Sequence, residues 1–217
     1  MCPVEHRSRQ TILRAQPFER HKSAELPPEL PEYRSLGDAR GEGMSFRSLV
    51  SVREILANPS VVPDSPGIYA WCFDESPVPP EFCGDCTVRE GCLILYIGIA
   101  AGQSLRDRIC KRHLRSASVS TLRLSLGCLL REECGLELRS ASRDHYDWGA
   151  GEENLTEWMA DHAFVAWHVH GDPETLEAGA IVRYRPPLNI KGNRQHPFCE
   201  HLVALRKRCK GEASSGG

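Results

Sequence analysis

The chain has 217 residues, of which 41% are hydrophobic and 7% aromatic, and its formal net charge is −2. This length is enough for one domain with a sizeable core, and the composition excludes a chain that is disordered throughout. The charge argues against a uniformly basic, histone-like protein, although it leaves room for local basic surfaces. The first ten residues contain no apolar signal-peptide segment, and the longest apolar run, at 93–101, is too short to span a bilayer. We therefore expect a cytoplasmic protein with no membrane partner, whose ten cysteines are thiols or metal ligands.

The charges are unevenly distributed along the chain. Residues 106–123 are strongly basic, residues 144–177 are acidic, and the C-terminal part is basic again. A polyanion could therefore bind locally despite the negative total.

Residues 1–43 are rich in Pro, Glu and Arg and show no periodicity, as in the segment ELPPELPEYR. This composition is typical of a disordered or loose arm. We expect the folded domain at 44–210 and a flexible Ser/Gly tail at 211–217.

The first half of the domain alternates helix and strand patterns. Apolar residues at helical spacing predict a helix over 48–57, which Asn58-Pro59 ends. β-branched and aromatic residues predict strands over 68–73 and 93–99, joined by a Pro- and Gly-rich loop at 74–91. Ser104 is a credible N-cap for a basic helix over 104–116.

The second half adds one strand and several helices. We expect helices from about 120 to 135, over 155–162, over 174–184 and over 197–210, and a loop at 139–153. Residues 164–169 predict a third strand. Three antiparallel strands flanked by helices on both sides make a layered α/β domain.

Two short strings stand on the first two strands. Gly67-Ile68-Tyr69 opens the first, and Tyr96-Ile97-Gly98 lies in the second. The string SLRDR follows at 104–108, Glu177 lies in the segment LEAGAIVRYRPPLN, and Asn189 comes twelve positions after it. In this order, over residues 65–190, these features resemble the GIY-YIG nuclease family. The resemblance implies the fold of that family, a bound divalent metal such as Mg²⁺ or Mn²⁺, and hydrolysis of phosphodiester bonds in a bacterial protein.

The resemblance also assigns roles to two charged residues. Glu177 would be the metal ligand, since hard divalent cations prefer carboxylate oxygen. Arg108 would clamp the scissile phosphate, because a guanidinium fork suits two phosphate oxygens and stays charged. The alternatives are a solvent-facing helix glutamate and a surface arginine.

The remaining candidates are uncharged. Tyr69 and Tyr96 would converge near the attacking water, one of them acting as general base, although two half-buried strand tyrosines are common in any sheet. Many family members carry a histidine four residues after the arginine, whereas His113 comes five after Arg108, so a surface histidine is an equal alternative. Asn189 would order the loop behind Glu177.

Three further basic residues, Lys111, Arg112 and Arg115, continue the predicted helix beyond Arg108. Beside a phosphodiester site such residues favour contact with the nucleic-acid backbone. DNA is the partner we expect, although the sequence does not distinguish it from RNA and predicts no oligomeric state. Two other readings stay open: a non-catalytic nucleic-acid-binding module, and a zinc-organised interaction protein.

The zinc hypothesis rests on the segment CGDCTVREGC. Cys83, Cys86 and Cys92 lie there, and Cys72 at the other edge of the hairpin could be a fourth ligand. A second closely spaced ligand pair is missing. If these cysteines hold structural zinc, protein purified without added metal should contain about one zinc per chain. Elemental analysis that finds no stoichiometric zinc would end this hypothesis.

Met44 stands where the irregular arm ends and the folded pattern begins. We therefore hypothesise that Met44 is the native start, in which case N-terminal sequencing of the native protein should begin there. Detection of residues that precede Met44 would contradict this.

Overall fold

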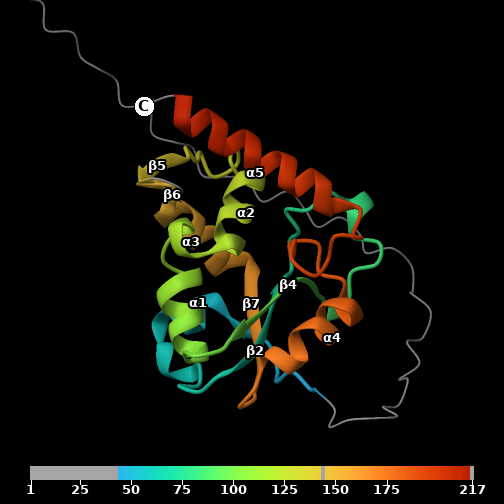
Figure 1. Ribbon diagram of the computed structural model, residues 1–217. Helices are drawn as coiled ribbons and strands as arrows, with labels where there is room; N and C mark the ends of the chain where they lie inside the picture. Colours follow the sequence, from blue (N-terminus) through green and yellow to red (C-terminus); the bar gives the residue numbers. More distant parts are fainter. Residues whose placement is uncertain (1–43, 143–144, 216–217) are drawn as a thin grey trace, which may run out of the picture. The chain divides into compact units, whose positions relative to one another are not determined.

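The computed structural model describes residues 44–142 and 145–215, so the predicted arm at 1–43 and the Met44 start lie outside them. A five-stranded antiparallel sheet forms the centre of the domain, with strand order β1-β7-β2-β4-β3. Its strands are β1 (Val50–Ser51), β2 (Gly67–Phe73), β3 (Val88–Arg89), β4 (Cys92–Ala100) and β7 (Ala163–Val169). Figure 1 shows β2, β4 and β7 at the centre of the helices.

The expectation of three strands is therefore wrong in number. The three predicted strands form the middle of the sheet, and β1 and β3 add two residues each at its edges. A two-residue strand has no readable alternation, because its pairing depends on a partner that is distant in the sequence. A second sheet, β5 (Arg139–Ser142) with β6 (His145–Asp147), also stands where a loop was predicted.

The helices flank the sheet. They are α1 (Val52–Ala57), α2 (Thr121–Leu129), α3 (Gly151–His162), α4 (Glu174–Tyr184) and α5 (Phe198–Ser215). A π-helix, η3 (Asp107–His113), follows β4, and 3₁₀ turns occur at η1 (Pro59–Val61), η2 (Pro80–Phe82) and η4 (Ala117–Val119). In the described part of the chain, no helix combines the length and the apolar character needed to cross a membrane.

Several helix bounds differ from the predicted ones for local reasons. α1 begins only at Val52, because Ser51 caps it by accepting a hydrogen bond from the Glu54 N–H while β1 pairs with β7. α2 ends at Leu129, and the following turn closes at Gly135 with φ 60°. α4 has the bounds predicted for it, whereas α5 continues as far as Ser215, into the segment predicted as a tail.

The two faces of the sheet bury different clusters. Tyr69, Trp71 and Phe73 of β2 face the larger cluster, which includes residues of α1, α2 and α3. Ile68, Ala70 and Cys72 face the smaller one, which includes Ala180 and Ile181 of α4. Every residue of β2 is buried, as expected for a strand covered on both faces.

The pairing of β2 with β4 places the two tyrosines on one face. Tyr69 lies opposite Gly98, and Trp71 lies opposite Tyr96. A Cβ atom at position 98 would lie 2.4 Å from the hydroxyl oxygen of Tyr69. The Tyr69 hydroxyl therefore occupies space that is open only because residue 98 is glycine. Gly67 serves a similar purpose, since a Cβ there would lie 2.4 Å from the carbonyl oxygen of His168.

We predict that Gly98→Ala destabilises the protein by about 1–3 kcal/mol, because the added methyl group must displace the Tyr69 hydroxyl. Denaturant unfolding measures the change. Gly179→Ala is the control: nothing lies within 4 Å of a Cβ at this helical glycine, so the change should stabilise by about 0.5–1 kcal/mol. An unchanged free energy of unfolding for Gly98→Ala would show that the site tolerates a side chain.

Candidate active site

Tyr69 is fully buried, and two side chains hold its hydroxyl group. The hydroxyl lies 2.6 Å from Nε2 of His113, and Nε of Arg108 donates a hydrogen bond to its oxygen at 3.2 Å. Burial, reinforced by the nearby Tyr96, raises the pKa of Tyr69, while Arg108 lowers it by a smaller amount. Tyr69 is therefore a neutral phenol at neutral pH.

His113 continues the chain of hydrogen bonds. Its Nδ1 lies 2.6 Å from the Ser120 hydroxyl oxygen, which also accepts from the Arg123 N–H as the N-cap of α2. Burial, with Arg108 and Arg123 nearby, holds the pKa of His113 well below its usual range. A neutral imidazole has one donor and one acceptor nitrogen, so His113 can join Tyr69 to Ser120.

The π-helix explains the spacing between Arg108 and His113. In η3 the Leu114 N–H bonds to the Ile109 carbonyl, a hydrogen bond over five residues instead of four. A residue five positions after Arg108 thereby comes to the same side of the helix as Arg108. The spacing that made His113 doubtful in the sequence is thus compatible with its contact to Tyr69.

Tyr96 lies against the same histidine. Its ring centroid is 5.9 Å from that of His113, and the rings of Tyr69 and Trp71 lie at 5.4 and 5.7 Å, all in edge-to-face geometry. Burial raises the pKa of Tyr96, opposed by hydrogen bonds from Thr121 and Arg108. We call Tyr69, Tyr96, Arg108 and His113 the tyrosine cluster.

Arg108 is half-buried at the edge of this cluster. Within residues 44–142 and 145–215 it has no carboxylate partner. Its guanidinium stays charged, and after its contacts with Tyr69 and Tyr96 it retains further N–H donors for an anion.

Glu177 approaches the cluster from the N-terminal part of α4. Its carboxylate is half-buried and close enough to both tyrosines to oppose their ionisation. No described residue forms an ion pair with it. A carboxylate free of such ion pairs suits a hydrated Mg²⁺, which keeps several water ligands.

Asn189 fixes the loop after α4 to β4. Its Nδ2 donates to the Ile97 carbonyl and its Oδ1 accepts from the Ile97 N–H, both at 2.8 Å. The Leu188 N–H donates to the Leu95 carbonyl. These bonds occupy the edge of β4 beyond β3 and attach the loop after α4 to that strand. The Asn189 side chain therefore contacts the backbone of β4.

The basic residues after Arg108 differ in their pairing. Lys111, Arg112 and Arg115 are exposed, and Lys111 pairs with Asp107 at 2.7 Å. Arg112 and Arg115 have no ion pair with any residue that the structure describes.

The candidate zinc cysteines form two pairs. A hydrogen bond from the Cys86 thiol lowers the pKa of Cys83, and Cys72 lies close enough to Cys92 to interact electrostatically. No three His, Cys, Asp or Glu side chains of the described residues group so that they could hold a metal ion. Structural zinc stays a prediction for elemental analysis.

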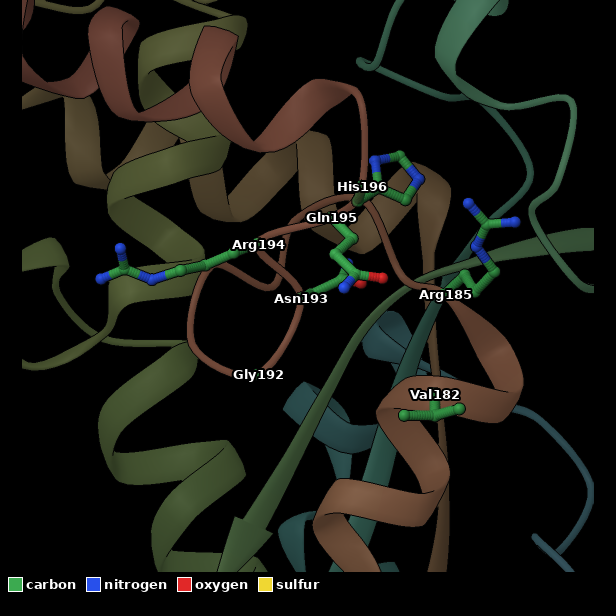
Figure 2. Close-up of a pocket in the computed structure, with 7 residues that line it drawn as sticks. All are labelled: Val182, Arg185, Gly192, Asn193, Arg194, Gln195 and His196. Carbon is green, nitrogen blue, oxygen red and sulfur yellow. The ribbon is translucent and has the colours of Figure 1, made fainter.

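A cavity of about 650 Å³ lies between the end of α4 and residues 192–196. Figure 2 shows its lining, from Val182 and Arg185 on α4 and its cap to His196. Nη1 of Arg185 pairs with Asp85 at 2.7 Å, which joins this cavity to the cysteine loop. The residues that line it are distinct from the tyrosine cluster.

Two residues of this site carried no signal in the sequence. Ser120 and Thr121 start α2, and the pattern there indicated only a helix beginning. Their contacts with His113 and Tyr96 depend on how α2 packs, which no local spacing encodes.

Comparison with known proteins gives one match. The family model described as the GIY-YIG catalytic domain matches residues 67–208, which include the whole tyrosine cluster, Glu177 and Asn189. No curated protein and no solved structure is similar enough to the chain to count as a match.

Proposed function

Because the chain belongs to the GIY-YIG family, whose domain implies nuclease activity and a nucleic-acid substrate, we propose that it is a metal-dependent endonuclease that hydrolyses phosphodiester bonds in DNA. The observation that carries the proposal is the Tyr69 hydroxyl, which Arg108 and His113 hold close enough to the Glu177 carboxylate for the two to interact electrostatically. We also propose a cytoplasmic location, which the free thiols of the described cysteines support.

Arg108 would bind the scissile phosphate. Its terminal nitrogens can donate two parallel hydrogen bonds to phosphate oxygens, and these bonds strengthen as charge develops in the transition state. The Nε bond to Tyr69 fixes the guanidinium plane, which reduces the entropy lost when substrate binds.

Glu177 would hold a hydrated Mg²⁺ or Mn²⁺. Such a cation, when bound, neutralises phosphate charge and acidifies a coordinated water. Asn189 serves Glu177 indirectly, because its two bonds to Ile97 fix the loop that follows α4.

Tyr69 would orient the attacking water as a neutral phenol, and the proton of that water would leave to solvent. Burial keeps Tyr69 protonated, and its hydroxyl can donate to Nε2 of His113, 2.6 Å away, because the imidazole is held neutral. The lone pairs of the Tyr69 oxygen then remain for Arg108 and the water. Tyr96 would orient the same water from the neighbouring strand β4, on the same face of the sheet as Tyr69.

Lys111, Arg112 and Arg115 would contact the backbone on one side of the scissile bond. Arg112 and Arg115 suit this role best, since both are exposed and free of ion pairs with described residues. The alternative function, a non-catalytic nucleic-acid-binding module, would need these residues but not Glu177.

We predict that the purified protein nicks supercoiled plasmid or branched DNA with Mg²⁺ or Mn²⁺ and that EDTA abolishes the reaction. Glu177→Ala and Arg108→Ala should each lower the cleavage rate by at least about 10²-fold, as expected for loss of a transition-state contact. Glu174→Ala removes an exposed carboxylate from the same helix turn and should leave the rate unchanged.

Two results would contradict the proposal. Cleavage that survives Glu177→Ala would remove the assigned metal ligand. Binding without cleavage, equal in the wild type and both variants, would favour the non-catalytic module.

A further inference from the structure

A second, smaller cavity lies on the α5 side of the tyrosine cluster. It has a volume of about 230 Å³ and is lined by residues of η4, the start of α2, β6 and α5. Its polar lining includes Ser118, Thr121, Tyr146, Arg206 and Lys210, and none of the lining residues is acidic. We call it the α5 pocket. Figure 1 shows α5 lying along α2, which the contacts between these helices support.

The α5 pocket begins where the tyrosine cluster ends. Ser120 and Thr121 belong to its lining; Ser120 bonds to His113, and Thr121 lies close enough to Tyr96 to lower the pKa of its hydroxyl. Arg206 lies close enough to Tyr96 to interact electrostatically. The pocket and the cluster therefore share the start of α2.

Arg206 is the unusual residue of the pocket. It is half-buried, and burial lowers the pKa of its guanidinium. In the described ranges its guanidinium has neither an ion pair nor a hydrogen bond, whereas the buried Arg123 pairs with Glu152 and also bonds to Thr156. Because its N–H groups have no partner among the described residues, Arg206 has a hydrogen-bonding capacity that the protein itself does not use.

Lys210 adds a second cation one helical turn later. Its Nζ lies 4.9 Å from the centre of the Tyr146 ring, a cation–π contact that holds the ammonium at the pocket. Ser118 and Thr121 add hydroxyl groups to the lining. Two cations, two hydroxyl groups and no carboxylate form a receptor for a small, strongly charged oxyanion.

We propose that the α5 pocket binds a phosphodiester group of the substrate strand that flanks the scissile phosphate, with Arg206 as the main contact. The inference rests on the proposed function and extends it, because it gives the strand a second fixed point on α5. Arg115 stands exposed just before η4, so basic side chains continue from the Arg108 helix to the pocket.

The test is binding of a labelled DNA duplex by the full chain in EDTA, measured by fluorescence anisotropy over a range of salt concentrations. Arg206→Gln should weaken binding about tenfold and reduce the slope of log K against log salt by about 0.9, the value for one lost phosphate contact. Lys207→Gln is the matched control, since it removes one exposed positive charge from the next position of α5 and should leave the slope unchanged.

Thermal unfolding verifies that each variant is folded. If Arg206→Gln is not, Lys210→Gln replaces it, with the same direction expected for affinity and slope. A folded pocket variant with the affinity and slope of Lys207→Gln, beside a wild type that binds and cleaves DNA, would overturn this inference alone. A wild type that neither binds nor cleaves would overturn the proposed function and this inference with it.

Discussion

The hydroxyl group of Tyr69 fills the space that a side chain at position 98 would occupy, and the arrangement of the site depends on this close approach. The contact requires Tyr69 to pair with Gly98, and this register of β2 against β4 puts Tyr96 on the same face. A slip of one residue would turn every side chain of β4 to the opposite face and separate the two hydroxyl groups. The two glycine-containing strings are thus coupled: Gly98 of the second string leaves the space that the Tyr69 hydroxyl of the first string fills.

A second constraint acts through the π-helix. The π-helical turn in η3, which holds one residue more than an α-helical turn, brings His113 into hydrogen-bonding distance of Tyr69. Its hydrogen-bond geometry is less favourable than that of an α-helix. Surrounding contacts hold this conformation: Nη1 of Arg123 donates to the His113 carbonyl at 3.4 Å, and the buried guanidinium pairs with Glu152. The Glu152 carboxylate in turn accepts from the Ala117 N–H, so α3 fixes both ends of the segment that carries the histidine and its serine partner.

The features that sequence could predict are those encoded by local composition and periodicity. The two tyrosine strands follow from their β-branched and aromatic content, and α4 follows from helical spacing. The two-residue edge strands, the π-helix and the contact of Ser120 with His113 could not be predicted in this way. In each case tertiary packing decides which hydrogen bonds form. The local sequence is equally compatible with a loop in place of the edge strands and with an α-helix in place of the π-helix.

The charges around the tyrosine cluster are unbalanced, and this imbalance is informative about the ligand. Arg108 and Arg206 both interact electrostatically with Tyr96, and neither pairs with a carboxylate of the described residues. Burial disfavours the charged form of Arg206. Glu177 is the acid that acts on both tyrosines, and it too is free of ion pairs with described residues. Keeping them apart leaves two cationic positions for an extended anion and one carboxylate for a cation, which is the charge pattern of a phosphodiester bound together with a metal ion.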